Sequence, residues 1–320
     1  MRSKNRIVSE TVRKIKALEI QGSSNVRKAV LLAIRESVVQ SKAKSIKRLR
    51  SELGKNMLLL ASARPTEPET RNALISIWHI AEQDLPTEKI KEEIANACER
   101  FEKNRNEALE KICAYATDEL KKCETIFTHC HSSTVEKIIV AMHQKGTLKK
   151  VFCTETRPLF QGRITARNLV KAGISCTMVV DSAARAFIGE ADAFLTGCDA
   201  IFYNGSVVNK IGTSMISLAA KQKKVPHYVA TVSQCFDPAT YYGKKTEIEE
   251  RSYKEVWPEK PKALLIRNPA FDITEANLVK SIICECGVFK PRSFTSFMVN
   301  KLGLKGKKYK SLEELIRPYL

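Results

Sequence analysis

The chain has 320 residues, which is long enough for two domains and a sizeable core. No run of about 18 apolar residues occurs, and the first residues lack the apolar stretch of a signal peptide. We therefore expect a cytoplasmic protein with no membrane contact. The ten cysteines are scattered and show none of the usual zinc-ligand spacings, so we expect thiols and neither a disulfide framework nor a metal site.

The net charge of +19 attracts polyanions, but its meaning stays open at the level of sequence. Basic residues cluster at 42–50, 221–224 and 301–310, and no recognised nucleic-acid motif accompanies them. Bound RNA, a phosphorylated metabolite and a simply solvated basic surface are all compatible with this charge.

The first third of the chain carries apolar residues at helical spacing. This pattern predicts an all-helical domain over residues 1–118, with helices at 8–19, 26–40, 45–61 and 86–121. The last segment is expected to be one amphipathic helix or a helical hairpin. Before the second helix, Ser23, Ser24 and Asn25 are natural N-caps. The same helix start also offers backbone N–H groups to an anion.

From residue 119 onward, strand-like runs alternate with helical segments. Runs that resemble strands occupy 125–128, 151–154, 176–180, 193–195, 200–203, 228–231 and 263–266. The alternation predicts an α/β fold class, in which a Rossmann-like domain with a mainly parallel sheet covers residues 119–320. Polar clusters follow several of these strands and should converge on one rim of the sheet, where a polar small molecule can bind.

One of these clusters is His129-Cys130-His131, between a strand and a helix. A cysteine at a strand end, ahead of a helix and flanked by imidazoles, is well placed to act as a thiolate nucleophile or base. The alternative is an unreactive cysteine in a crowded turn. A metal held by all three residues is disfavoured, because adjacent residues on a strand point to opposite faces.

A second cluster lies between Thr196 and Thr213. It places Asp199 where a strand ends, and it supplies Asn209 and Lys210 ahead of a helix-forming run. An acid, an amide and an ammonium group at such a rim suit a phosphorylated or hydroxylated ligand. Asp199 as a plain turn or capping residue is the alternative.

Five segments, in this order, resemble one superfamily: THCHSSTV, VFCTETRPLFQGRITARNLVKAGI, VVDSAARAFI, GCDAIFYNGSVVNKIGT and NPAFDIT. The superfamily contains ribose-1,5-bisphosphate isomerases, 5-methylthioribose-1-phosphate isomerases and the α, β and δ regulatory subunits of translation initiation factor 2B. The chain is most similar to the archaeal ribose-1,5-bisphosphate isomerase branch. The resemblance implies a helical domain followed by a Rossmann-like domain, assembled as a homodimer or homohexamer.

The resemblance further implies an enzyme, with Cys130 as catalytic base and Asp199 as catalytic acid, because the regulatory subunits generally lack this pair. The implied reaction is the aldose–ketose isomerisation of a pentose 1-phosphate, ribose 1,5-bisphosphate to ribulose 1,5-bisphosphate, in AMP or nucleoside salvage. No metal or organic cofactor is implied. The implied substrate-binding residues are Gly22, Ser23, Ser24, Arg64, Ser132, Ser133, Thr134, Asn209 and Lys210.

Two departures from the isomerase pattern remove expected cationic phosphate contacts. Gln21 stands where the isomerases usually have an arginine, and Cys235 where they usually have a lysine. Each lost charged hydrogen bond costs roughly 1.5–3 kcal/mol of binding. The alternative is therefore a regulatory subunit resembling initiation factor 2B, which binds a sugar phosphate or nucleotide and has initiation factor 2 or RNA as a partner.

Overall fold

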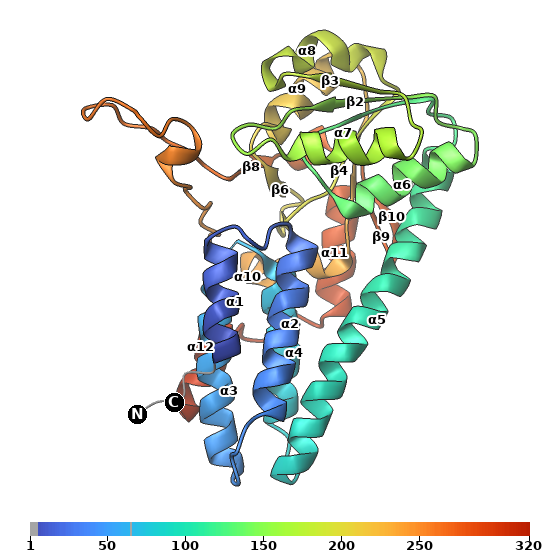
Figure 1. The fold of residues 1–320 in the computed structure, drawn as a ribbon. Coiled ribbons are helices and arrows are strands. Elements are labelled where there is room, and N and C mark those ends of the chain that lie inside the picture. Colours follow the sequence, from blue (N-terminus) through green and yellow to red (C-terminus); the bar gives the residue numbers. More distant parts are fainter. Residues whose placement is uncertain (1–5, 65) are drawn as a thin grey trace. The chain divides into compact units, whose positions relative to one another are not determined.

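The computed structural model describes residues 6–64 and 66–320. These residues form two compact units, traced by colour along the chain in Figure 1. The helical unit contains the described residues up to Glu107 together with the returning segment Gly306–Leu320, and the α/β unit is Ala108–Lys305. The expected domain boundary after residue 118 stays a prediction about independently folding domains.

The helical unit follows the apolar periodicity of the sequence. Its helices are α1 (Arg6–Lys16), α2 (Ser23–Val39), α3 (Ile46–Ala61), α4 (Pro68–Ala81), the first part of α5 (Thr87–Glu119), and α12 (Leu312–Ile316). The helices expected at 8–19, 26–40 and 45–61 are confirmed, and the segment 86–121 is one helix and not a hairpin. Among the described residues, no helix is long and apolar enough to cross a membrane.

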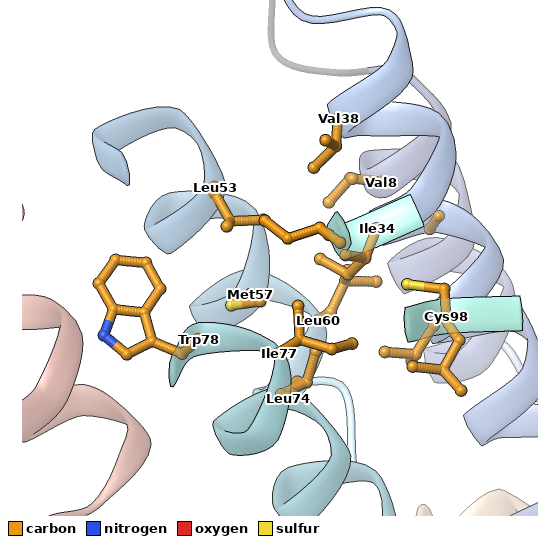
Figure 2. Packing of buried hydrophobic residues seen from close by; sticks show 14 of the residues in the cluster. Val8, Ile34, Val38, Leu53, Met57, Leu60, Leu74, Ile77, Trp78 and Cys98 are labelled. Carbon is orange, nitrogen blue, oxygen red and sulfur yellow. The ribbon is translucent and has the colours of Figure 1, made fainter. Parts of the chain in front are cut away.

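Large apolar side chains from several helices fill the interior of the helical unit (Figure 2). Ile34 of α2, Met57 of α3 and Trp78 of α4 are completely buried there. The Trp78 ring meets Tyr319 edge-on at 5.3 Å between centroids, so the end of the chain completes this core.

The α/β unit is built on a seven-stranded sheet in the order β10-β9-β7-β4-β1-β2-β3. All neighbouring pairs are parallel except β9 with β10. The strands are β1 (Thr125–Thr128), β2 (Lys150–Thr154), β3 (Cys176–Val179), β4 (Ala193–Thr196), β7 (His227–Ala230), β9 (Ser281–Cys284) and β10 (Gly287–Phe289). The predicted α/β class with a mainly parallel sheet is thus confirmed.

Helices cover both faces of this sheet because successive strand residues alternate between the faces. Phe127, Phe152 and Phe194 pack on one face with α8 (Ala184–Phe187) and α9 (Thr213–Gln222). The other face packs Ile126 and its neighbours against α6 (Ser133–Gln144) and α7 (Gln161–Lys171), and Figure 1 shows α7 alongside β2. The remaining helices of the unit are α10 (Pro238–Tyr241) and α11 (Pro291–Lys301).

The chain order creates a topological switch point between β1 and β4. From β1 the chain adds β2 and then β3 on one side, and it then crosses to place β4 on the other side of β1. Ligands of open α/β sheets bind in the crevice beyond the carboxyl ends of the strands at such a point. A small antiparallel sheet of β5 (Ala200–Ile201), β6 (Val207–Lys210) and β8 (Phe271–Thr274) follows β4 in the chain.

The prediction of a strand at residues 263–266 is wrong. Residues 263–266 form no strand, and Leu265 is 90% exposed. These residues lie in a long irregular segment between α10 and β8, where no neighbouring strand pairs with them. An apolar run is therefore a strand signal only where a sheet edge is available to accept it.

Candidate active site

The switch point brings the Cys130 and Asp199 segments side by side. Phe127 of β1 pairs in register with Phe194 of β4, and the two strands are parallel, so both end at the same rim of the sheet. Just beyond the strands, a Cβ at Gly197 would lie only 2.8 Å from the Ser132 hydroxyl oxygen. The two loops that carry the candidate base and acid are therefore in direct contact, and the glycine permits it.

The backbone of Cys130 is held in an unusual conformation. Its φ is 68°, in the left-handed region that a residue with a side chain rarely adopts. Its N–H donates to Thr156 Oγ1 at 3.0 Å, and its carbonyl oxygen accepts from Thr165 Oγ1 at 3.0 Å. Such strain costs about 1–3 kcal/mol and persists only where the surroundings impose it, as they often do at active sites.

The two histidines beside Cys130 both have a pKa below the ordinary value of an imidazole. His129 Nε2 donates to the Ile211 carbonyl oxygen at 2.9 Å, and its Nδ1 lies 2.6 Å from Thr154 Oγ1. Burial lowers the pKa of His129 to about 4, and burial also lowers the pKa of His131. A lowered pKa leaves less positive charge on each imidazole, so the thiolate form of Cys130 stays a prediction that rests on its place between a strand end and a helix start. The start of α6, three residues after Cys130, is the positive end of a helix dipole.

The residues expected to meet the substrate after Cys130 form the start of α6. Ser132 is the N-cap, and its hydroxyl oxygen accepts the Val135 N–H. Ser133 is exposed and Thr134 is buried. Their contacts with a substrate stay a prediction, although the helix start places Ser132 and Ser133 beside the loop that carries Asp199.

Asp199 is tied to the strand that carries the other expected ligands. Its N–H donates to the Val208 carbonyl oxygen at 2.8 Å, immediately before Asn209 and Lys210 in β6. The Asn209 amide donates to Thr213 Oγ1 at 3.0 Å, and the Lys210 ammonium lies 5.2 Å from the centre of the Phe271 ring. The acid, the amide and the ammonium group thus come from one connected piece of backbone.

The carboxylate of Asp272 holds the backbone that follows Lys210, where α9 begins. Its carboxylate accepts the N–H groups of Gly212 at 2.8 Å and Ser214 at 3.1 Å, at the start of α9. Burial raises the pKa of Asp272 to about 6, against the lowering effect of these hydrogen bonds. Because this carboxylate already occupies the start of α9, that helix start is not the place for a phosphate.

The two departures from the isomerase pattern have separate structural settings. Cys235 is only 2% exposed, and its sulfur accepts a hydrogen bond from Thr231 Oγ1 at 3.1 Å, so its side chain belongs to the core. Gln21 is exposed and donates to the Leu18 carbonyl oxygen at the end of α1. Neither side chain supplies the missing positive charge.

In the helical unit, Gly22, Ser23 and Ser24 form the start of α2. Gly22 is the N-cap with a φ of 80°, and within the described residues no side chain caps this helix. The expectation that Ser23, Ser24 or Asn25 would be the N-cap is therefore wrong, since Ser23 is already the first helical residue. An uncapped helix start keeps its N–H groups available to an anion.

Arg105, which the sequence did not single out, reaches this helix start. It is 9% exposed, and its Nη2 donates to Ser24 Oγ at 3.4 Å. Its Nη1 is buried and has no hydrogen-bond partner among the described residues. Glu69, 1% exposed, accepts from Ser23 and pairs with both Arg105 and Arg27. The predicted ligand Arg64 contacts Glu67 at 3.4 Å, just before α4.

Gln161 is a further candidate that the sequence reading passed over. It is the first residue of α7, and its side-chain oxygen is buried without a hydrogen-bond partner among the described residues. A buried amide oxygen normally has a hydrogen-bond partner, and the hydroxyl group of a ligand would be a suitable donor to it.

Within residues 6–64 and 66–320, no three His, Cys, Asp or Glu side chains gather as a metal site.

Comparison with known proteins identifies the family of the chain and proteins that share its fold. The model of the Initiation factor 2 subunit family matches residues 19–291. The ribose 1,5-bisphosphate isomerase of Methanocaldococcus jannaschii is 38% identical over 288 residues, which cover 89% of this chain and 92% of that protein.

Two solved structures from Pyrococcus horikoshii OT3 share the fold. One is described as translation initiation factor eIF-2B, with a TM-score of 0.78, 26% identity, and coverage of 89% of this chain and 98% of the other. The second is a 5-methylthioribose 1-phosphate isomerase, with a TM-score of 0.76, 27% identity, and coverage of 92% and 88%. The chain belongs to the Initiation factor 2 subunit family.

Proposed function

We propose that the chain is an aldose–ketose isomerase that converts a pentose 1-phosphate, ribose 1,5-bisphosphate, into ribulose 1,5-bisphosphate in nucleoside salvage. The observation that carries the proposal is the meeting of the Cys130 and Asp199 loops at the β1–β4 switch point. The 38% identity to an enzyme named for this substrate supports it. A phosphorylated pentose is made inside the cell, which agrees with a cytoplasmic protein rich in cysteine thiols.

The proposed chemistry is proton transfer alone, so it requires no metal or organic cofactor. A pentose whose anomeric oxygen is phosphorylated cannot open to a free aldehyde. Asp199, in its protonated form, gives its proton to the ring oxygen as the bond from that oxygen to C1 breaks. Cys130, as a thiolate, removes the C2 proton, which leaves a phosphoenolate between C1 and C2. Cys130 then returns the proton to C1 while the C2 hydroxyl gives its proton back to Asp199, and the ketose forms.

The remaining predicted residues bind the substrate in this proposal. Ser132, Ser133, Thr134, Asn209 and Lys210 surround the reacting carbons in the α/β unit. Gly22, Ser23, Ser24 and Arg64, joined by Arg105, hold a phosphate at the start of α2. Two guanidinium groups and an uncapped helix start offset the cationic contacts that Gln21 and Cys235 no longer provide.

Turnover of defined substrates tests the proposal. Purified protein is given ribose 1,5-bisphosphate, ribose 1-phosphate and 5-methylthioribose 1-phosphate in separate reactions. We expect ribulose 1,5-bisphosphate from the first, and about 10²–10⁴-fold loss of kcat in Cys130→Ser and in Asp199→Asn. Cys286→Ser, in the turn between β9 and β10, is the matched control and should keep full activity.

Deuterium at C2 of the substrate sharpens the result. Transfer by a single base predicts deuterium at C1 of the product, partly replaced by solvent hydrogen. Absence of turnover with all three sugar phosphates would overturn the proposal.

The second candidate function is a regulatory subunit, which the structural likeness to a protein described as initiation factor eIF-2B favours. It predicts capture of initiation factor 2, or RNA binding that weakens steeply with salt. Failure to recover the factor from lysate counts against it. We also propose that the chain assembles as a homodimer or homohexamer, which light scattering coupled to size-exclusion chromatography measures.

A further inference from the structure

Polar groups from three neighbouring strands converge on the backbone of Cys130. Asp181, which follows β3, accepts the N–H of Thr156 at 2.8 Å through Oδ1 and the N–H of Arg157 at 2.6 Å through Oδ2. Thr156, which follows β2, accepts the N–H of Cys130 at 3.0 Å. Since β3, β2 and β1 are adjacent, the contacts run in one line along the rim of the sheet.

Two linked residues in this line are strained. Thr156 has a φ of 63° and Cys130 a φ of 68°, both in the left-handed region. Neither residue is glycine, so each conformation needs support from outside its own loop. The Asp181 carboxylate supplies it for Thr156 by binding two successive N–H groups, and Thr156 supplies it for Cys130.

The hydrogen-bond directions in the rest of the network follow from chemistry. The Ile211 carbonyl oxygen only accepts, so His129 Nε2 is the donor to it. In neutral His129, Nδ1 must then accept, and Thr154 Oγ1 donates to it at 2.6 Å. Thr156 Oγ1 donates to Thr154, whose Oγ1 lies 3.3 Å away and whose carbonyl oxygen lies 3.5 Å away, while its oxygen accepts from Cys130. A side chain without a hydroxyl at position 156 would remove two hydrogen bonds from this network, the one to Thr154 and the one from the Cys130 N–H.

We propose that Asp181 is a positioning residue for Cys130 and that it acts through Thr156. The carboxylate sets the turn that presents Thr156 Oγ1 to the Cys130 N–H, and this contact sets the direction in which the Cys130 side chain leaves the backbone. The inference rests on the proposed function, in which the Cys130 sulfur takes a proton from the substrate. Displacing a reacting group by about 1 Å can cost about 100-fold in rate.

The first test compares kcat and KM across matched variants. Asp181→Asn keeps the size of the side chain but offers only one oxygen acceptor to two N–H groups. Thr156→Val keeps the shape and removes the acceptor, whereas Thr156→Ser keeps the hydroxyl. We expect kcat to fall about 10- to 100-fold in Asp181→Asn and Thr156→Val, with KM changed less than about threefold. Thr156→Ser should stay within about threefold of the wild type in both.

The double variant separates positioning from simple structural support. Thr156→Val retains the backbone N–H groups that Asp181 binds, so Asp181→Asn lowers the thermal midpoint in both backgrounds. If Asp181 acts on Cys130 through Thr156, Asp181→Asn costs no further kcat once Thr156 is valine. Multiplied losses of kcat in the double variant, or an unchanged kcat in Asp181→Asn, would overturn the proposal.

A measurement without substrate keeps this inference distinct from the proposed function. Iodoacetamide labelling of Cys130, followed peptide by peptide with mass spectrometry, should change in rate at least about threefold in Asp181→Asn and Thr156→Val and not in Thr156→Ser. Cys286 is the internal reference and should label equally in all four proteins. Wild-type protein without turnover would end the proposed function, whereas unchanged Cys130 labelling in every variant would end the positioning role.

Discussion

Ser132 lies against the backbone of Gly197, with its hydroxyl oxygen 2.8 Å and its Cβ 3.1 Å from where a Cβ at residue 197 would lie. Alanine at this position therefore pushes the Cys130 loop and the Asp199 loop apart. We expect Gly197→Ala to lower the free energy of unfolding by about 1–3 kcal/mol, the usual effect of overpacking. It should also lower kcat by at least about tenfold, because the reacting groups separate. Denaturant unfolding and steady-state kinetics measure the two effects.

The companion variant removes the clash from the other side. Ser132→Gly in the Gly197→Ala protein vacates both atoms, so part of the lost stability should return relative to Gly197→Ala alone. If the double variant is no more stable than Gly197→Ala, the two loops are not in the contact described.

Acid should destabilise the protein through His129. Its pKa is about 4 in the folded protein and about 6.5 in an unfolded chain, so the unfolded state binds the proton more tightly. This contribution to stability is complete above pH 6.5 and is lost as the pH falls towards 4, by on the order of 3 kcal/mol. Unfolding free energies of wild type and His129→Gln, measured from pH 4 to 7, should diverge in this window. Parallel curves would contradict the prediction.

Asp272 should act in the opposite sense. Its pKa is about 6 in the folded protein and about 3.8 unfolded, so the folded state binds the proton more tightly. Its contribution to stability is complete below about pH 4 and is lost as the pH rises through 6, by on the order of 2–3 kcal/mol. Asp272→Asn should remove this dependence. Each variant must be compared with wild type separately, because the windows of Asp272 and His129 overlap.

The imidazole of His131 should contribute little to the reactivity of Cys130. Burial lowers the pKa of His131, which disfavours the charged imidazole, and its Nδ1 lies 3.1 Å from Thr165 Oγ1. We expect His131→Asn to move the pH midpoint of Cys130 alkylation by less than about 0.5 unit. A shift of a full unit or more would show that a charged imidazole faces the sulfur.

The start of α2 should bind inorganic phosphate with the help of Arg105. Phosphate that binds only the folded protein raises its thermal midpoint in a concentration-dependent way. Arg105→Lys keeps the charge, but a single ammonium group cannot donate to Glu69 and Ser24 at the same time as the guanidinium group does. We therefore expect the phosphate-induced shift of the thermal midpoint to fall by more than half. Arg100→Lys, on the exposed face of α5, is the control. Equal shifts in all three proteins would exclude Arg105 from the phosphate site.

The parallel strands of the sheet were predictable because each is a short buried run between polar residues. β1 has the expected bounds, β2, β3 and β4 differ from expectation by one residue at one end, and β7 is shifted by one residue at both ends. The helix α4 was not predicted, because buried polar residues such as Glu69 and Thr70 interrupt its apolar face. The strands β6, β8, β9 and β10 were also missed; β6, β8 and β9 pair with strands distant in the sequence, and β10 pairs with β9.

The candidate site was predictable in its reacting groups but not in their support. Cys130 and Asp199 stand at strand ends, and a resemblance assigns them roles. The contacts of Thr156 and Thr165 with Cys130, and of Asp181 with Thr156, depend on left-handed backbone at Cys130 and Thr156, which are not glycine. Local sequence disfavours such backbone, so only the folded surroundings reveal it.

The return of the C-terminal segment to the helical unit has a consequence for biosynthesis. Tyr319 contacts Trp78, and Ile316 packs at Gly54, so α3 and α4 are completed by residues that are synthesised after the whole α/β unit. On the ribosome, the α/β unit can close as soon as its own strands have emerged, whereas the helical unit must wait until residues 306–320 have also emerged. A nascent chain stalled before residue 306 should therefore expose the Trp78 side of the helices to chaperones.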